Sequence, residues 1–558
     1  MLKLIETPPK PTRRETLFLL LVSCLWAAAL LFIDPALARA EADALAEAAN
    51  QLKTAPMAEL EQAIGRLAKI NDPRVPGLFK ALRDGRLFYV KASGRMVLAD
   101  PKDDGYALAD ALSGEALGET GRFDVKKIPV NNALRNVLGV AIAQLELNAP
   151  DARQRLRAVE SIGQNLNADS AALLRRQAEQ ETDAAVREAI AVALALADLA
   201  GTDKSSRLKA IQTLEGSLNQ EARNRLANLQ EKTDEGGFVE PDSDIRNHAA
   251  AALKQIEIKL ELNHLGETLF FGLSLGAVLV LSAIGLAITF GVMGVINMAH
   301  GELMMLGAYT TYVVQTLMPG HIDGSLFVAV PAAFVIAGLV GIAIERGIIR
   351  FLYGRPLETL LATFGLSLFL QQTVRSIFSP LNRSVSTPSW MSGSLEINSA
   401  LSLTLNRFYI TLFSLLVFLA LLAILKRTRL GLEVRAVSQN RAMAKAMGIR
   451  TDWVDAMTFG LGSGIAGVAG VALSQLTNVG PNLGQAYIVD SFMVVVFGGV
   501  GNLWGTLVGG LALGVADKIL EPYAGTVLAK ILMLVFIILF IQKRPRGLFP
   551  QKGRAAEA

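Results

Sequence analysis

A histidine and a glutamate lie between two long apolar stretches of this chain, in the segment Asn297-Met-Ala-His300-Gly-Glu302. Ionisable side chains among membrane-spanning segments cost free energy, and they usually face the interior of a helix bundle or a path for solutes. One interpretation is local, because Asn297 and Glu302 can cap a helix beginning near Leu303, where free backbone N–H groups favour a carboxylate. The other places Asn297, His300 and Glu302 at the inner end of a translocation path or at a gate.

A second group of polar side chains lies further along the chain. Asn478, Asn482 and Gln485 precede or begin an apolar run, and Asp490 lies inside it. Amide side chains both donate and accept hydrogen bonds, so the first three suit a neutral polar solute. Asp490 is interpreted either as a boundary residue at the outer surface of the membrane or as a polar group of the same path.

The elements that must position these residues belong to a membrane domain. Hydrophobic residues make up 52% of the 558 residues, and they become far denser after about Leu265. We therefore expect a soluble domain at 41–265, a transmembrane domain at 266–550 and a short tail at 551–558. The net charge of +4 does not suggest nucleic-acid binding. The only cysteine, Cys24, excludes an internal disulfide or a cysteine-based metal site.

The first 40 residues have the features of a secretory signal peptide. Lys10, Arg13 and Arg14 precede the apolar run 16–33, and small residues at 36–40 offer cleavage sites. The alternative is an uncleaved anchor helix. Both interpretations export the domain that follows.

The exported domain is expected to be mostly α-helical, because its apolar residues recur at helical spacing. The segments Asp183–Arg187 and Asp242–Arg246 share the pattern Asp-x-x-aliphatic-Arg, which is typical of HEAT-like helical repeats. An alanine-rich helical bundle is the alternative. Residues 87–90 and 95–98 predict one short β-hairpin. No catalytic arrangement is evident in this domain, so we expect an interaction or spacer module and assign the whole chain to the all-α class.

Nine apolar segments are expected to cross the membrane, namely 268–290, 303–317, 326–344, 357–378, 408–425, 456–476, 487–500, 506–520 and 527–541. A straight span needs roughly 20 residues, so 303–317 and 487–500 are expected to be re-entrant or broken helices. Glycines at four-residue spacing, such as Gly272 and Gly276, indicate close helix packing.

Basic residues gather in three loops, at 346–355, 426–450 and 543–546, which are expected in the cytoplasm. With nine crossings the loop 379–407 and the exported domain then face the outside. The loop 428–450 carries small and apolar residues among its charges, which predicts short amphipathic helices broken near Gln439-Asn440. Attachment of this loop to anionic lipid headgroups is the alternative to protein docking.

Two motifs resemble the permeases of ABC importers of the branched-chain amino-acid type, a family that includes urea permeases. The segment Asn297–Glu302 is similar to their Asn-Phe-Ala-His-Gly-Glu element. The second motif is similar to their ATPase-coupling loop, and its matching residues are Arg435, Ala436, Ala444, Gly448 and Ile449. The resemblance covers about 269–550. It implies ATP-binding subunits, a second related permease and a periplasmic solute-binding protein as partners, in a bacterial inner membrane.

The resemblance implies a transport subunit and not an enzyme, with ATP hydrolysis on its partners. No Gly-Lys-Ser/Thr sequence occurs in the chain, and Gly498–Gly505 is interpreted as a tight turn on the cytoplasmic side or a broken helix. We expect no cofactor, metal or nucleic acid. Urea is the favoured solute, because the urea-type permeases carry a long exported region. Import of branched-chain amino acids is the alternative within the family. A self-sufficient channel or ion-coupled transporter, or a sensor anchored by its membrane part, would be a different class.

Overall fold

The computed structural model of the chain describes residues 45, 47, 49–53, 59–68, 70, 72, 74–102, 105–163, 166, 168–234 and 236–550. The expected signal peptide at 1–40, with Cys24, and the tail at 551–558 lie outside these residues. The chain divides into two compact units, Met1–Ile256 and Glu257–Ala558, which are described separately. The division falls within one long helix, α11 (Ser243–Met293).

The first unit contains more β-structure than the single hairpin expected. After α3 (Leu60–Ala68) and α4 (Val75–Arg83), five strands form an antiparallel sheet in the order β4-β3-β2-β1-β5. The strands are β1 (Leu87–Val90), β2 (Met96–Lys102), β3 (Gly105–Asp110), β4 (Ala116–Gly121) and β5 (Val125–Lys127). The hairpin β1–β2 is confirmed, with Phe88 opposite Val97. The all-α assignment is wrong here, because alternate apolar residues of four strands, including Val97, Leu108 and Val125, close a small core of their own.

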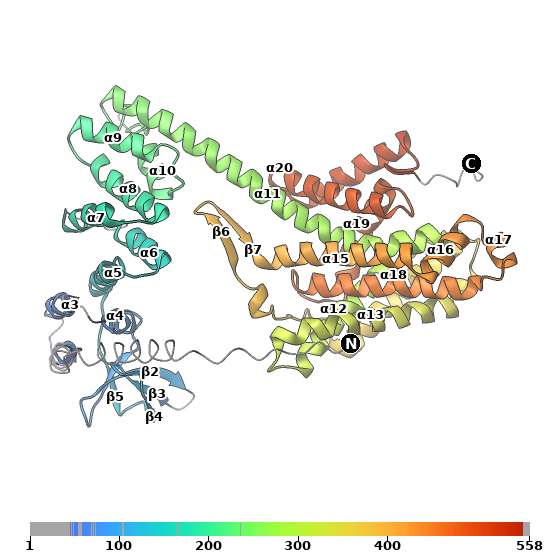
Figure 1. Ribbon diagram of the computed structural model, residues 1–558, viewed down its shortest axis with the longest axis horizontal. Coiled ribbons are helices and arrows are strands. Elements are labelled where there is room, and N and C mark those ends of the chain that lie inside the picture. The colour runs from blue at the N-terminus through green and yellow to red at the C-terminus, as the bar shows by residue number, and fades with distance from the viewer. Residues whose placement is uncertain are drawn as a thin grey trace, which may run out of the picture. The chain divides into compact units, whose positions relative to one another are not determined.

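Six helices follow the sheet and stack one after another (Figure 1). They are α5 (Asn132–Glu146), α6 (Ala152–Gly163), α7 (Ala168–Gln180), α8 (Ala184–Leu199), α9 (Lys204–Leu214) and α10 (Gln220–Asn228). Aspartate or asparagine side chains cap α5, α8, α9 and α10 by accepting hydrogen bonds from backbone N–H groups. The unit is therefore mainly helical, as expected.

Arginines in three first turns make the same pair of contacts. Arg155, Arg187 and Arg246 each donate to two carbonyl oxygens, five and six residues before them in the chain. Each arginine follows an aspartate by four residues, at Asp151, Asp183 and Asp242. This recurring Asp-x-x-x-Arg device fixes the entry of the chain into a helix. It is consistent with a repeat, and the HEAT-like assignment stays a prediction.

An ion pair joins neighbouring copies of this device. The Arg155 guanidinium donates to both carboxylate oxygens of Glu181, at 2.9 and 2.8 Å, and Glu181 stands two residues before Asp183. Arg207 Nη2 likewise donates to Glu240, which stands two residues before Asp242, although a single hydrogen bond joins this pair. Glu181 and Glu240 are buried, so each needs its arginine to offset the loss of water.

Stability of the first unit should fall in acid through Glu181. The side-chain hydrogen bond from Arg155 lowers the pKa of Glu181 to about 2. The ionised carboxylate therefore contributes its full share to the free energy of unfolding above pH 4.5, and this contribution is lost as the pH falls toward 2. We expect Glu181→Gln to destabilise the unit by about 3 kcal/mol at pH 7. Its stability should also depend less on pH between 5 and 3. Hydrogen exchange of the α6 and α8 amides in the full chain measures both effects. The exposed pair Glu221–Arg225 supplies the control, Glu221→Gln, which should change neither.

The second unit holds every predicted apolar segment on a helix. Besides α11 these are α12 (His300–Leu317), α13 (Ile322–Gly347), α14 (Pro356–Phe378), α15 (Leu405–Arg427), α18 (Thr451–Ser474), α19 (Leu483–Gly498) and α20 (Leu503–Lys543). By length and composition, five helices of the described chain could cross a membrane, in α11, α13, α15, α18 and α20, and α19 is a shorter apolar helix. The nine crossings stay a prediction.

The helix break in this unit lies in α20 and not in the short segments 303–317 and 487–500. Helices α12 and α19 are continuous over 18 and 16 residues, so neither is broken, and a re-entrant path for them stays a prediction. The interrupted element is α20, where Gly525 has φ 77° three residues after Pro522. Proline removes a backbone donor and glycine accepts the left-handed conformation, which together end one helix and start another.

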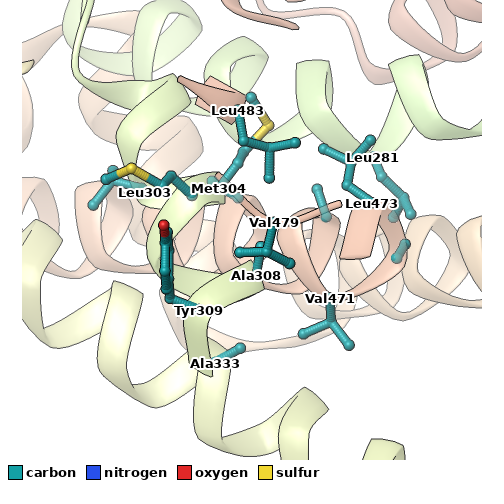
Figure 2. Packing of buried hydrophobic residues seen from close by; sticks show 14 of the residues in the cluster. Leu281, Leu303, Met304, Ala308, Tyr309, Ala333, Val471, Leu473, Val479 and Leu483 are labelled. Carbon is teal, nitrogen blue, oxygen red and sulfur yellow. The ribbon is translucent and has the colours of Figure 1, made fainter. Parts of the chain in front are cut away.

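Helix α18 lies at the centre of this unit and packs mainly on α13 and α12. Figure 2 shows the apolar core between them, where Met304 and Ala308 of α12 lie beside Val471 and Leu473 of α18. The predicted glycine packing is confirmed between α11 and α20, because a Cβ at Gly276 would lie 2.7 Å from the Cα of Leu511. Such distances leave no room for a side chain, so the helices meet backbone to backbone.

Two connections complete the unit. Between α14 and α15 a hairpin forms from β6 (Ser394–Asn398) and β7 (Leu401–Thr404), and the backbone of Arg383 pairs with that of Val479. Between α19 and α20 the chain turns through Gly499 and Gly501, both with positive φ, as expected of a turn between helices.

Candidate functional site

Glu302 connects two helices inside the second unit. It lies in the first turn of α12, 1% exposed, and its Oε1 accepts hydrogen bonds from Ser367 Oγ at 2.9 Å and from Gln371 Nε2 at 2.7 Å. Both donors belong to α14. The expectation that Glu302 caps a helix is therefore wrong, because its carboxylate bonds sideways to a neighbouring helix.

The buried face of α14 is polar, which sequence analysis missed. Thr359, Thr363, Ser367 and Gln371 recur every four residues and are all buried, whereas Leu357, Leu361 and Phe369 are exposed. Thr363 Oγ1 accepts a hydrogen bond from the Met298 amide at 3.2 Å. The polar stripe thus faces the segment 296–302, and the apolar side faces away. Four polar residues at helical spacing inside an apolar segment were the available signal.

His300 and Asn297 are completely buried beside this stripe. His300 Nε2 lies 2.9 Å from the Ser282 carbonyl oxygen, so this nitrogen carries the proton and Nδ1 is an acceptor. Asn297 Oδ1 accepts from the Ala299 amide at 3.0 Å, a local contact as expected. Three buried atoms lack a hydrogen-bond partner among the described residues, namely His300 Nδ1, Asn297 Nδ2 and Glu302 Oε2. Unpaired buried polar atoms are costly, so such a concentration marks a candidate functional site.

The start of α19 adjoins this cluster, but its polar side chains are not all part of it. A Cβ at Gly484 would lie 2.8 Å from the Glu302 amide nitrogen, so α19 begins against α12. Asn482 Oδ1 accepts a hydrogen bond from Arg375 Nη2 of α14 at 2.7 Å, one turn beyond Gln371. Asn478 and Gln485 are exposed. Among the described residues, the predicted amide that hydrogen-bonds to the helix with the polar stripe is that of Asn482.

Asp490 belongs to a separate contact. Its Oδ2 lies 3.1 Å from Lys530 Nζ, which joins α19 to the part of α20 beyond Gly525. The Asp490 side chain is mostly buried and that of Lys530 is half exposed. Among the described residues, no group of three or more His, Cys, Asp or Glu side chains could hold a metal ion.

The predicted break in the basic loop is confirmed. Helix α16 (Arg429–Gln439) ends at Gln439, and α17 (Arg441–Ala446) begins after Asn440, whose side chain caps it. Figure 1 shows both helices at one end of α15 and α18. Arg435 is exposed and donates to the Leu425 carbonyl, Ala436 and Ile449 are partly buried, and Ala444 is buried. Gly448 is exposed and has φ 87°, which ends α17 in a left-handed turn.

This helical pair has two apolar faces. Val434, Val437 and Ala444 pack inward on Val454 of α18. Met443 and Met447 instead point outward and are 60% and 77% exposed. Exposed methionines on a short helix are suited to a groove on another protein, because this flexible side chain fills irregular surfaces.

Comparison with known proteins places the second unit among transport proteins. The family described as branched-chain amino acid transport system / permease component matches residues 268–541. The high-affinity branched-chain amino acid permease protein LivH of Escherichia coli K12 is 35% identical over 293 residues, which cover 50% of this chain and 94% of that protein. BraD of Pseudomonas aeruginosa is 30% identical and covered to 96%, over 52% of this chain. The ribose import permease RbsC of E. coli K12 is 33% identical over 106 residues, 18% of this chain and 33% of that protein. No solved structure matches.

Proposed function

Because this chain belongs to the family of branched-chain amino acid transport permeases, we propose that it imports urea as the membrane-spanning half of an ATP-driven transporter. Membership of the family makes the chain a transport subunit of the inner membrane and not an enzyme. ATP-binding and solute-binding partners follow from the importer class in general. The single observation that supports a transport path is the Glu302 carboxylate, buried between α12 and α14 with one oxygen unpaired among the described residues.

The proposed orientation follows from charge. Residues 41–265 form the periplasmic domain, and 266–550 form the permease domain with its C-terminus in the cytoplasm. The basic segments around Arg346, in α16 and α17, and at Lys543 then all face the cytoplasm. Solute released by a periplasmic binding protein enters a cavity that opens outward when the ATPases close on ATP, and a second, related permease completes the cavity.

The site residues take two roles in this proposal. Asn297, His300 and Glu302, with the polar stripe of α14 and Asn482, form the gate of the path. Arg435, Ala436, Ala444, Gly448 and Ile449 present α16 and α17 to an ATP-binding subunit, and the exposed methionines enter its groove. Asp490 pairs with Lys530 and serves to hold α19 against α20.

Urea is favoured by two features. The alignments to LivH and BraD cover nearly all of those proteins with about half of this chain, so the proposed exported unit is additional to them. A long exported region is the feature by which the chain resembles the urea-type permeases. The buried stripe Thr359, Thr363, Ser367 and Gln371 is neutral, and it offers hydroxyl and amide groups of the kind that pair with urea.

Branched-chain amino acids are the second candidate, and the placement of two charged residues favours them. Glu302 lies close enough to Arg375 for their charges to interact, so one negative and one positive group lie at the same end of α14. A zwitterion needs both signs of charge. The names of LivH and BraD point to the same solutes.

Uptake by the complete importer separates these candidates. Proteoliposomes holding the permeases, the ATP-binding subunits and the binding protein are given radiolabelled urea or leucine. We expect urea, and not leucine, to accumulate against a gradient only when ATP reaches the ATPases. Accumulation of leucine alone would assign the second candidate. Accumulation that persists when ATP hydrolysis is blocked would assign a channel or ion-coupled transporter and contradict the proposal.

A further inference from the structure

An ion pair with a buried carboxylate joins α17, one of the two helices proposed to face the ATPase, to α18. Arg441 is the first residue of α17, and Asp455 lies in α18, one turn after Thr451. Arg441 Nη1 donates to Asp455 Oδ1 at 3.2 Å, and Nη2 donates to Oδ2. The Asp455 side chain is 0% exposed, whereas that of Arg441 is 40% exposed. Two parallel hydrogen bonds from a planar guanidinium fix direction as well as distance.

The same arginine contacts a third element. Its guanidinium lies 4.6 Å from the ring centroid of Tyr353, in the connection between α13 and α14. This cation–π contact adds a second restraint on the arginine. Arg441 thus ties α17 at once to α18 and to the chain that leads into α14, the helix with the polar stripe.

The surroundings make Asp455 dependent on Arg441. Glu345 of α13 is buried and lies close enough to Asp455 for the two negative charges to interact. The nearest cation to Glu345 Oε2 is its neighbour Arg346, at 3.7 Å, a distance too long for a hydrogen bond. Loss of Arg441 would leave a buried carboxylate beside another one, which low-dielectric surroundings penalise strongly.

The apolar contacts between α17 and α18 do not fix the direction in which one helix would move the other. Ala444 of α17 and Val454 of α18 belong to one apolar cluster. Van der Waals contacts between such small side chains attract the two helices but do not fix the position of one along the other. The ion pair is directional, and it ends on the helix that packs on α12 and α13. A displacement of α17 is therefore conveyed to the centre of the bundle through the Asp455 carboxylate.

We propose that Arg441 is a positioning residue that conveys the motion of the ATPase from α17 to α18 through its ion pair with Asp455. This inference rests on the proposed function, because it requires an ATPase docked on α16 and α17. Its signature is uncoupling. When the link is broken, the ATP-binding subunits still hydrolyse ATP, but the bundle no longer follows.

The test uses the complete importer in proteoliposomes, with uptake, ATP hydrolysis and co-purification of the subunits measured on one preparation. For Arg441→Ala we expect uptake to fall at least tenfold, with ATP hydrolysis per assembled complex changed less than twofold. Arg355→Ala is the matched control, since Arg355 pairs with the exposed Glu358 on the same side of the unit, and uptake should stay within twofold.

Two double variants distinguish a role of the ion pair in transmitting ATPase motion from a role in folding alone. Arg441→Ala with Asp455→Asn removes the unpaired buried charge, so the amount of assembled complex should recover while uptake stays at least tenfold low. Arg441→Asp with Asp455→Arg restores an ion pair, and at least a third of the uptake should return. If the first double variant transports as well as the wild type, the pair serves only folding and the inference is wrong. ATP-driven uptake of neither urea nor leucine by the wild-type complex would instead contradict the proposed function.

Discussion

Replacing Glu302 by glutamine is expected to lower ATP-driven uptake about 10- to 100-fold while the amount of inserted protein stays unchanged. The glutamine Oε1 can still accept the hydrogen bonds from Ser367 and Gln371. Its Nε2 would stand in place of Oε2, which has no partner in the described part of the chain, so the proposed gate would offer a solute a neutral donor where the carboxylate offers an acceptor. Hydrogen bonds to charged groups contribute about 1.5–3 kcal/mol, which corresponds to this range of rates. Initial uptake by proteoliposomes, normalised to the permease recovered, measures the effect.

Glu302→Ala distinguishes the gate from a merely structural role. The alanine variant removes the acceptor of two buried donors on α14 and, within the described chain, leaves Gln371 Nε2 only its 3.5 Å contact with Ser367 Oγ. A buried donor without a partner costs about 1–3 kcal/mol. The unfolding temperature of the alanine variant in detergent should therefore fall together with uptake, whereas that of the glutamine variant should not. Glu358→Gln, at an exposed position at the start of α14, is the control and should behave as wild type. Full uptake by Glu302→Gln would show that the carboxylate only joins two helices.

Local signals accounted for much of the second unit. Long apolar runs located all its membrane-domain helices, because burial of backbone groups in hydrocarbon requires helices of about that length. The apolar residues among the charges of 428–450 predicted two short helices broken near Gln439-Asn440, and the Asn440 side chain caps the second of them. These features depend on residues within a few positions of one another.

Features formed by distant residues were not predicted. Glu302 bonds to Ser367 and Gln371, which are 65 and 69 residues away, so its chemistry was foreseen and its partners were not. Arg441 stands among many basic residues, and only the fold brings Asp455 to it. The extra strands β3 to β5 are short and weakly apolar. They gain stability from pairing, β3 with β2, β4 with β3 and β5 with β1, rather than from their own sequence. The break in α20 was foreseen as two segments, although Gly525 and Pro522 were not named as its cause.

The close approach of α12 and α19 makes the stability of the second unit sensitive to a single added methyl group. A Cβ at Gly484 would lie 2.3 Å from the backbone carbonyl of Gly301, and a Cβ at Gly301 would lie 2.5 Å from the Gly484 oxygen. Backbone atoms cannot move aside as a flexible side chain can, so the helices must separate. Gly484→Ala is therefore expected to destabilise the purified chain by about 3 kcal/mol, which is the upper part of the usual range for overpacking.

Thermal unfolding in detergent tests this expectation, with Gly365→Ala as the control. Gly365 lies within α14 and has nothing within 4 Å of an added Cβ, so alanine there should leave the unfolding temperature unchanged or raise it. The double variant Gly301→Ala with Gly484→Ala should cost little more than Gly484→Ala alone. Once the first methyl group has separated the helices, the second meets open space, and contacting sites are not additive. Equal unfolding temperatures of Gly484→Ala and the wild type would mean that α12 and α19 do not meet at these glycines.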